Sequence, residues 1–206
     1  IYNGIQYSTK YIRNYYDKKH IINIFFIGSI CRLKRPDIFI DVLNILNELS
    51  SITFNGYIIG PVLEKSCFEE TEKKIKCAKN KGIIKYLGSI PHKKLLSDIY
   101  PNIDILFLSS DKDTLPTVIL EAMSFGKVVV ARNVDGVPEM ISDGIDGIIF
   151  KYTATPNEIA EKILFYIADN DFLNDISYAA YLKIREKFSN NIKKEKINWL
   201  IENNCF

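Results

Sequence analysis

Residues 109–141 read SSDKDTLPTVILEAMSFGKVVVARNVDGVPEMI, which places a polar loop, an apolar helix pattern and a buried strand in direct succession. The helix pattern starts at Pro116 and stops at Gly126, and the apolar run 128–131 follows it. Proline is favoured in the first turn of a helix and glycine just past its end, while short unbroken apolar runs are typical of strands covered on both faces. The stretch therefore predicts a helix packed against a parallel sheet.

The same alternation of strand and helix patterns runs outward in both directions, and it predicts six strands. The apolar runs lie at 22–27, 54–59, 83–87, 103–108, 128–131 and 147–150. Amphipathic helix patterns separate them, which favours an α/β fold: a doubly wound, parallel, six-stranded sheet with flanking helices. After the last strand the pattern predicts three consecutive helices, at 156–167, 172–188 and 192–202.

Composition narrows the class of protein. The chain has 206 residues, of which 47% are hydrophobic, enough for one sizeable core, and its net charge of +2 gives no reason to expect a nucleic acid or an anionic membrane as partner. Four scattered cysteines and two histidines give no reason to expect a zinc site, and such free thiols fit a reducing cytoplasm. No apolar run is long enough to span a bilayer, and the first residue is Ile, which suggests an excised piece of a longer protein.

The loop and helix at 109–125 also predict a ligand. Unpaired N–H groups at a helix N-terminus can hold a phosphate, whereas the carboxylates of Asp113 and Glu121 suit hydroxyl groups. A phosphate site beside a hydroxyl site predicts that the ligand is a sugar nucleotide. In an open parallel sheet the ligand lies beyond the carboxyl ends of the strands. Lys34 follows the first strand and is the main candidate to clamp a diphosphate, with Arg32 and Arg35 as weaker ones.

Each of these residues also has a plainer interpretation. Lys34 could belong to a basic surface loop, Asp113 could cap the following helix, and Glu121 could face solvent or form an internal salt bridge. His92, at the start of a helix pattern, is expected to be structural or exposed, and Glu139 to favour the dipole of the helix after the fifth strand. Gly28 lacks the partner glycines of a dinucleotide fingerprint, and no P-loop or Gly-x-Ser-x-Gly elbow is present.

Over nearly its whole length the chain resembles the C-terminal, donor-binding half of a family 4 (group 1) glycosyltransferase with the two-domain GT-B fold. Residues 113–131, DTLPTVILEAMSFGKVVVA, are similar to the family's Glu-x7-Glu signature and the Ala-Met-Ala-x-Gly-x-Pro-Val-Val segment that follows it. Further matches occur in the family's order, at Asn3-Gly4, Phe26-Ile-Gly28, Lys34-Arg-Pro-Asp37, Gly60-Pro61, Tyr86-Leu-Gly-Ser89, Tyr100 with Asp104, and Asp143-Gly-Ile-Asp-Gly147.

The resemblance implies a Rossmann-like domain that binds a nucleoside diphosphate sugar. It implies that Lys34 holds the diphosphate, Asp113 contacts the donor sugar, Glu121 accepts from the ribose and Ile90 packs on the base. Asp113 and Lys34 are the implied catalytic residues. The implied donor-binding residues are Gly28, Ser29, Lys34, Ile90, Asp113, Thr114, Leu115, Pro116, Thr117 and Glu121.

The implied reaction is retaining transfer of a sugar, of the hexosyltransferase type, to a glycan or lipid-linked acceptor, as in polysaccharide biosynthesis. No cofactor and no divalent metal are expected, because cations of the protein would neutralise the diphosphate and the sequence is interpreted as lacking an Asp-x-Asp metal motif. Residues 1–20 would be an interdomain segment, and residues 21–206 the nucleotide-sugar-binding domain, including the helices at 156–206. The expected location is cytoplasmic, including the inner face of the membrane. An N-terminal acceptor-binding domain would be missing, so this chain alone is expected to transfer sugar poorly.

Three departures from the family pattern bear on activity. Ser29 stands where the family often has Arg, so one cation is absent or supplied by Arg32. Asp113 replaces the first Glu of the signature, and Asp135-Gly136 replaces a common Gly-Gly, which adds a charge near the donor sugar. Two alternatives stay open at this point: half of a nucleotide-sugar 2-epimerase, and a non-catalytic nucleotide-sugar-binding module.

Overall fold

The structure is a computed structural model, and it describes residues 11, 20–78, 82–188, 194–195 and 198–199. A six-stranded sheet with the order β3-β2-β1-β4-β5-β6 forms its centre, and every neighbouring pair of strands is parallel. The strands are β1 (Ile21–Ile27), β2 (Thr53–Ile59), β3 (Ile84–Tyr86), β4 (Ile105–Leu108), β5 (Val128–Arg132) and β6 (Ile148–Phe150). The doubly wound, Rossmann-like α/β fold expected from the sequence is thereby confirmed.

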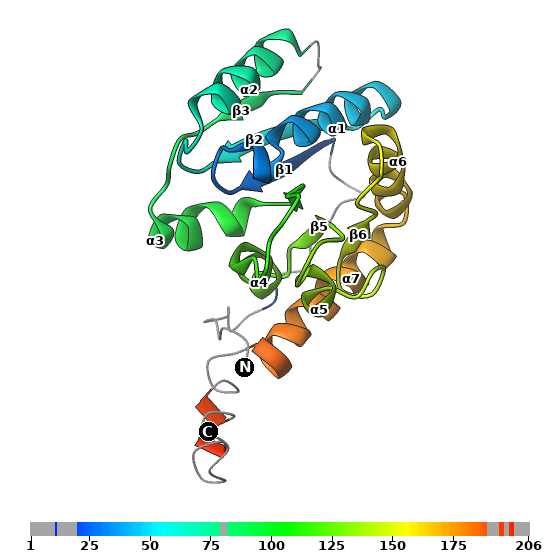
Figure 1. Ribbon diagram of the computed structural model, residues 1–206. Helices are drawn as coiled ribbons and strands as arrows, with labels where there is room; N and C mark the ends of the chain where they lie inside the picture. The colour runs from blue at the N-terminus through cyan, green and yellow to red at the C-terminus, as the bar shows by residue number, and fades with distance from the viewer. Residues whose placement is uncertain (1–10, 12–19, 79–81, 189–193, 196–197, 200–206) are drawn as a thin grey trace.

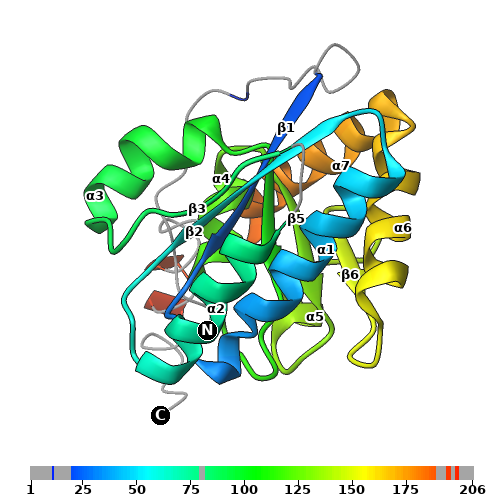
Figure 2. The same cartoon turned by 90° about the horizontal axis from the view of Figure 1, so that it is seen from above.

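Helices cover both faces of the sheet, as Figures 1 and 2 show. The longer ones are α1 (Pro36–Leu49), α2 (Lys65–Cys77), α4 (Thr117–Ser124), α6 (Pro156–Ile167) and α7 (Asn170–Lys183), with shorter α3 (His92–Lys94) and α5 (Val137–Met140). The core residues of α1 and α6 belong to one apolar cluster and those of α4 and α5 to the other. In Figure 2, α1 and α2 lie in front of the strands and α4 behind them.

Strand β1 shows how the sequence builds these two layers. Its side chains alternate between the faces of the sheet, as in any strand. Ile22, Ile24 and Phe26 enter the cluster under α1, and Phe25 and Ile27 enter the cluster under α4. Because both faces are apolar, the strand reads as an unbroken hydrophobic run in the sequence.

Some boundaries differ from the predicted ones. The helix expected at 92–100 is a chain of three short elements, in which α3 is followed by a π-helical turn (Leu95–Ile99) and a 3-10 turn (Tyr100–Asn102). Pro101 explains the change, since proline has no N–H to donate and restricts the residue before it. The helix expected at 172–188 is α7 followed by a second π-helical turn (Ile184–Phe188).

Two predicted segments fall largely outside the described residues. They are the interdomain segment 1–20 and the last C-terminal helix, 192–202. In the part of the chain that the structure does describe, no helix combines the length and the apolar character that crossing a membrane requires.

The strand order reverses between β1 and β4, which creates a crevice at the carboxyl ends of these strands. The loops that leave β1 and β2 meet there very closely. A Cβ atom added to Gly60, whose φ is +151°, would lie 1.9 Å from the backbone oxygen of Gly28. Only glycine allows this approach, so the glycines that end the first two strands set the shape of the crevice.

Candidate functional site

A cavity of about 260 Å³ lies in this crevice, at the carboxyl ends of β1 and β4 and the N-terminus of α4. Its lining residues are Ile27, Gly28, Ser29, Lys34, Leu108, Asp113, Leu115, Pro116, Thr117 and Val118. Most of the predicted donor-binding residues therefore share one cavity, although they come from loops far apart in the sequence. Ile90, Thr114 and Glu121 are not among its lining residues.

The two residues implied to be catalytic, Lys34 and Asp113, form an ion pair inside this cavity. The ammonium of Lys34 donates to Oδ2 of Asp113, and the two side chains are only 23% and 15% exposed. Asp113 does not cap the following helix, because the N-cap position of α4 is Pro116 and no side chain bonds there. The plainer interpretation of Asp113 as a helix cap is therefore wrong, whereas Lys34 is a partly buried residue paired with Asp113.

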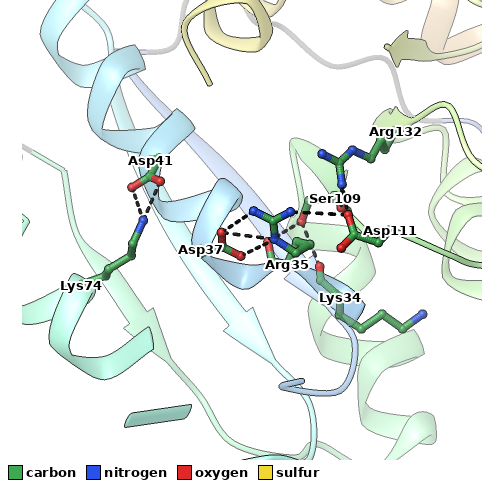
Figure 3. A network of polar contacts seen from close by, with 8 residues as sticks. All are labelled: Lys34, Arg35, Asp37, Asp41, Lys74, Ser109, Asp111 and Arg132. Atoms are coloured by element: carbon green, nitrogen blue, oxygen red, sulfur yellow. Dashed lines mark hydrogen bonds and ion pairs between the residues drawn. The ribbon is translucent and has the colours of Figure 1, made fainter. Parts of the chain in front are cut away.

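Lys34 and Arg35 are adjacent in the chain but point in different directions (Figure 3). Arg35 has a left-handed backbone, with φ of 53°, between the 3-10 turn Arg32–Lys34 and α1. Its guanidinium donates to both oxygens of Asp37, with Nη2 2.7 Å from Oδ2. Burial raises the pKa of Asp37, but the hydrogen bonds and charge of Arg35 outweigh it and hold that pKa below its usual value. Arg35 thus forms an ion pair with Asp37 and does not line the cavity.

Arg32 does not supply the cation that Ser29 leaves missing. Its Nη2 lies 3.2 Å from Oε1 of Glu70, and both side chains are 68% exposed. The two residues help to line a separate cavity of about 620 Å³ between the start of α1 and α2. That cavity is larger, but its charged groups are paired with one another or with Asp41, so it offers less to a charged ligand. Arg32 is not among the residues that line the cavity of Lys34, so of the two alternatives the structure favours the one in which that cation is absent.

Buried polar contacts fix the loops around the cavity, and sequence reasoning did not find them. The hydroxyl of Ser109 donates to the backbone oxygens of Lys34 at 3.1 Å and Arg35 at 2.7 Å. The carboxylate of Asp111 pairs with Arg35 and with the buried guanidinium of Arg132, which follows in β5 (Figure 3). The loops that follow β1 and β4 and the end of β5 are thereby joined beside the point where the strand order reverses.

Residues 133–137 hold the loop of Asp113 from the other side. The backbone N–H of Asp113 donates to Oδ2 of Asp135 at 3.0 Å. A Cβ atom on Gly136 would lie 2.0 Å from the backbone oxygen of Thr114, so only glycine fits against that loop. The charge of Asp135 thus lies beside Asp113, the residue predicted to contact the donor sugar.

Glu121 is neither solvent-facing nor free. Its side chain is 13% exposed, Oε1 lies 3.0 Å from Nε2 of His92, and Oε2 accepts from the hydroxyl of Tyr100 at 2.5 Å. Burial and the negative charge of Glu121 raise the pKa of Tyr100, so its hydroxyl stays protonated and can donate. One hint of this contact is present in the sequence, because Tyr100 is one of the positions that match the family.

The sequence does contain an Asp-x-Asp spacing, at Asp111-Lys-Asp113, so the interpretation that it lacks one is wrong. The two carboxylates do not converge: Asp111 pairs with Arg35 and Arg132, whereas Asp113 pairs with Lys34. Among the residues that the structure describes, no group of three or more His, Cys, Asp or Glu side chains is placed to hold a metal ion.

Comparison with protein families gives one clear match. The family model described as glycosyl transferases group 1 matches residues 12–183. A protein of the cps region of Klebsiella pneumoniae is 32% identical over 135 residues, which cover 66% of this chain and 34% of that protein. An N,N'-diacetylbacillosaminyl-diphospho-undecaprenol alpha-1,3-N-acetylgalactosaminyltransferase of Campylobacter jejuni is 33% identical over 90 residues, 44% of this chain and 23% of that enzyme. The chain thus spans about a third or less of the length of these curated relatives.

Solved structures share the fold. HepE of Anabaena, solved in complex with UDP and glucose, superposes with a TM-score of 0.77 at 21% identity, over 88% of this chain and 48% of HepE. The C-terminal domain of LpcC, a group 1 glycosyl transferase of Francisella tularensis, superposes with a TM-score of 0.73 at 23% identity. That match covers 82% of this chain and 87% of the LpcC domain, so the two correspond over most of their lengths.

Proposed function

Because this chain belongs to the group 1 glycosyl transferase family, we propose that it is the donor-binding part of a retaining glycosyltransferase that uses a nucleoside diphosphate sugar. The observation that carries the proposal is the placement of Lys34 and Asp113 together in a cavity at the N-terminus of α4. A cation and helix N–H groups suit a diphosphate, and a neighbouring carboxylate suits sugar hydroxyls. The complex of HepE with UDP and glucose supports the same class of donor.

In the proposed reaction the protein stabilises the leaving diphosphate. Lys34 and the N–H groups at the start of α4 neutralise the negative charge that develops when the bond to the sugar breaks. Asp113 then exchanges its contact with Lys34 for hydroxyl groups of the donor sugar. Because these groups already balance the charge, we propose that transfer needs no divalent metal and no cofactor.

The acceptor belongs to the same proposal. The names of relatives from a cps region and of one that acts on an undecaprenol diphosphate saccharide favour a glycan or lipid-linked acceptor. We expect an N-terminal domain to bind it, hexosyl transfer to be the reaction, and the complete protein to work in the cytoplasm at the inner face of the membrane. Sugar transfer by this chain alone, at the rate of a longer parent protein, would contradict the need for that domain.

A binding module without transferase activity is the second candidate, and one observation favours it. Among the described residues that line the cavity, Lys34 is the one cationic side chain, and its ammonium already forms an ion pair with Asp113. Such a module would bind the nucleotide sugar, while its longer parent would show no turnover. Product analysis of that parent separates the two candidates.

Calorimetric titration of the chain with UDP, GDP, ADP and CMP tests the proposed site. We expect saturable binding of one nucleoside diphosphate, and about tenfold weaker binding by Glu121→Gln, because a hydrogen bond to a charged group is lost. Glu70→Gln is the matched control, since Glu70 is 68% exposed on α2. Equal affinities of Glu121→Gln and the unaltered chain would remove Glu121 from the binding site.

In the same titration, Asp113→Asn should not weaken nucleotide binding as Glu121→Gln does. The substitution removes the charge that competes for the ammonium of Lys34, so we expect the affinity for a nucleoside diphosphate to stay the same or to rise by about two- to fivefold. Transfer by the longer parent should nevertheless fall, because a sugar contact is weakened. A loss of nucleotide affinity in Asp113→Asn would show that the carboxylate contacts the nucleotide itself.

A further inference from the structure

The carboxylate of Glu121 is held by two neighbours that differ sharply in burial. Tyr100 is fully buried and donates to Oε2, whereas the side chain of His92 is 65% exposed and lies against Oε1. Oε2 therefore faces the protein core, and Oε1 faces the protein surface. A ligand that approaches from solvent can replace the contact with His92 but cannot reach the contact with Tyr100.

Tyr100 itself is fixed by the segment that carries Glu121. Its ring stacks on Phe125 at the end of α4, with 5.7 Å between ring centroids and planes 8° apart. The buried ammonium of Lys127 donates to the backbone oxygen of Pro101 at 2.9 Å. The 3-10 turn of Tyr100 is thus tied to the α4–β5 segment at three points, and its hydroxyl has little freedom to turn away from Glu121.

We propose that Tyr100 is a positioning residue for Glu121: it fixes Oε2 in the core so that Oε1 is presented to the vicinal hydroxyls of the bound ribose. This inference rests on the function proposed above for the same site. A carboxylate fixed by a buried donor needs little reorganisation when the ligand binds, and its buried oxygen is not left without a partner. His92 occupies Oε1 until ribose hydroxyls replace it.

The test compares ligands that differ only in the groups that Glu121 would contact. Calorimetry on the chain and on Tyr100→Phe would use UDP, GDP and ADP, their 2′,3′-dideoxy forms, and inorganic pyrophosphate. We expect Tyr100→Phe to bind the tightest of the nucleoside diphosphates about tenfold more weakly, as the loss of a hydrogen bond to a charged group predicts. Its affinity for the dideoxy form and for pyrophosphate should match that of the unaltered chain.

Tyr166→Phe is the matched control, because Tyr166 is a buried tyrosine of α6 in the cluster on the opposite face of the sheet. It should bind all the ligands like the unaltered chain. A Tyr100→Phe variant that binds ribose and dideoxyribose ligands with equally reduced affinity, or that also loses pyrophosphate, would overturn the positioning role in favour of a structural one. Unchanged binding by Tyr100→Phe would overturn the role of Tyr100 alone, whereas an unaltered chain that binds no nucleoside diphosphate would overturn the proposed function as well.

Discussion

Lys34→Ala is expected to weaken nucleoside diphosphate binding by about 100-fold, which corresponds to about 2.7 kcal/mol. The side chain is 23% exposed and points into the cavity at the start of α4, where two charge-assisted hydrogen bonds to a diphosphate can form. None of the other described residues that line this cavity can replace its charge. Calorimetric titration of the variant against the unaltered chain measures the effect.

Arg32→Ala provides the control in the same loop. Its guanidinium is exposed and paired with Glu70, so we expect nucleotide affinity to change by less than about twofold. If both variants lost affinity to the same extent, the loop would act through its general positive charge, and the specific role of Lys34 would be refuted. Raising the salt concentration would then abolish binding by the unaltered chain too.

Asp111→Ala is expected to lower the free energy of unfolding by about 3 kcal/mol, because it leaves the buried guanidinium of Arg132 without its carboxylate partner, which is itself 29% exposed. The side chain of Arg132 is 6% exposed, and without Asp111 its remaining contacts are the backbone oxygen of Ser109 at 3.3 Å and the ring of Tyr152 at 4.5 Å. Neither neutralises a buried charge. Urea unfolding followed by circular dichroism gives the free energy directly.

Glu70→Ala is the matched comparison, since it breaks an ion pair of the same type that is 68% exposed on both sides. Exposed pairs contribute between about 0 and 1 kcal/mol, so this variant should be nearly as stable as the unaltered chain. If the free energy of unfolding fell by a similar amount in the two variants, Arg132 would have found another partner in the absence of Asp111.

The architecture could be predicted from the sequence because short, mostly apolar strand patterns alternate with amphipathic helix patterns, and glycines follow three of the strands. Gly28, Gly60 and Gly88 follow three of the strands, so the loops that could form a site were identifiable before the fold was known. Lys34 and Asp113 were found for the same reason. Loops at the carboxyl ends of neighbouring strands must meet, whatever their separation in the sequence.

The partners of individual side chains could not be predicted in this way. Whether Lys34 or Arg35 enters the cavity depends on the left-handed backbone of Arg35, which no feature of that residue signals. The contact of Tyr100 with Glu121 depends on a helix that changes to a π-helical turn and then to a 3-10 turn that contains Pro101. Both outcomes are decided by packing between segments and not by local pattern.

The strand order also determines when each pair of strands can form during synthesis. β1 lies at the centre of the sheet, paired with β2 along its whole length on one side and with β4 at Ile24 and Phe25 on the other. The ribosome delivers β2 soon after β1, but β4 begins only at Ile105. Until then the emerging chain carries an apolar strand with one open edge, so we expect this stage of synthesis to favour chaperone binding and self-association. We expect the pairing of β1 with β4 to form slowly, because it joins two segments that are far apart in the sequence.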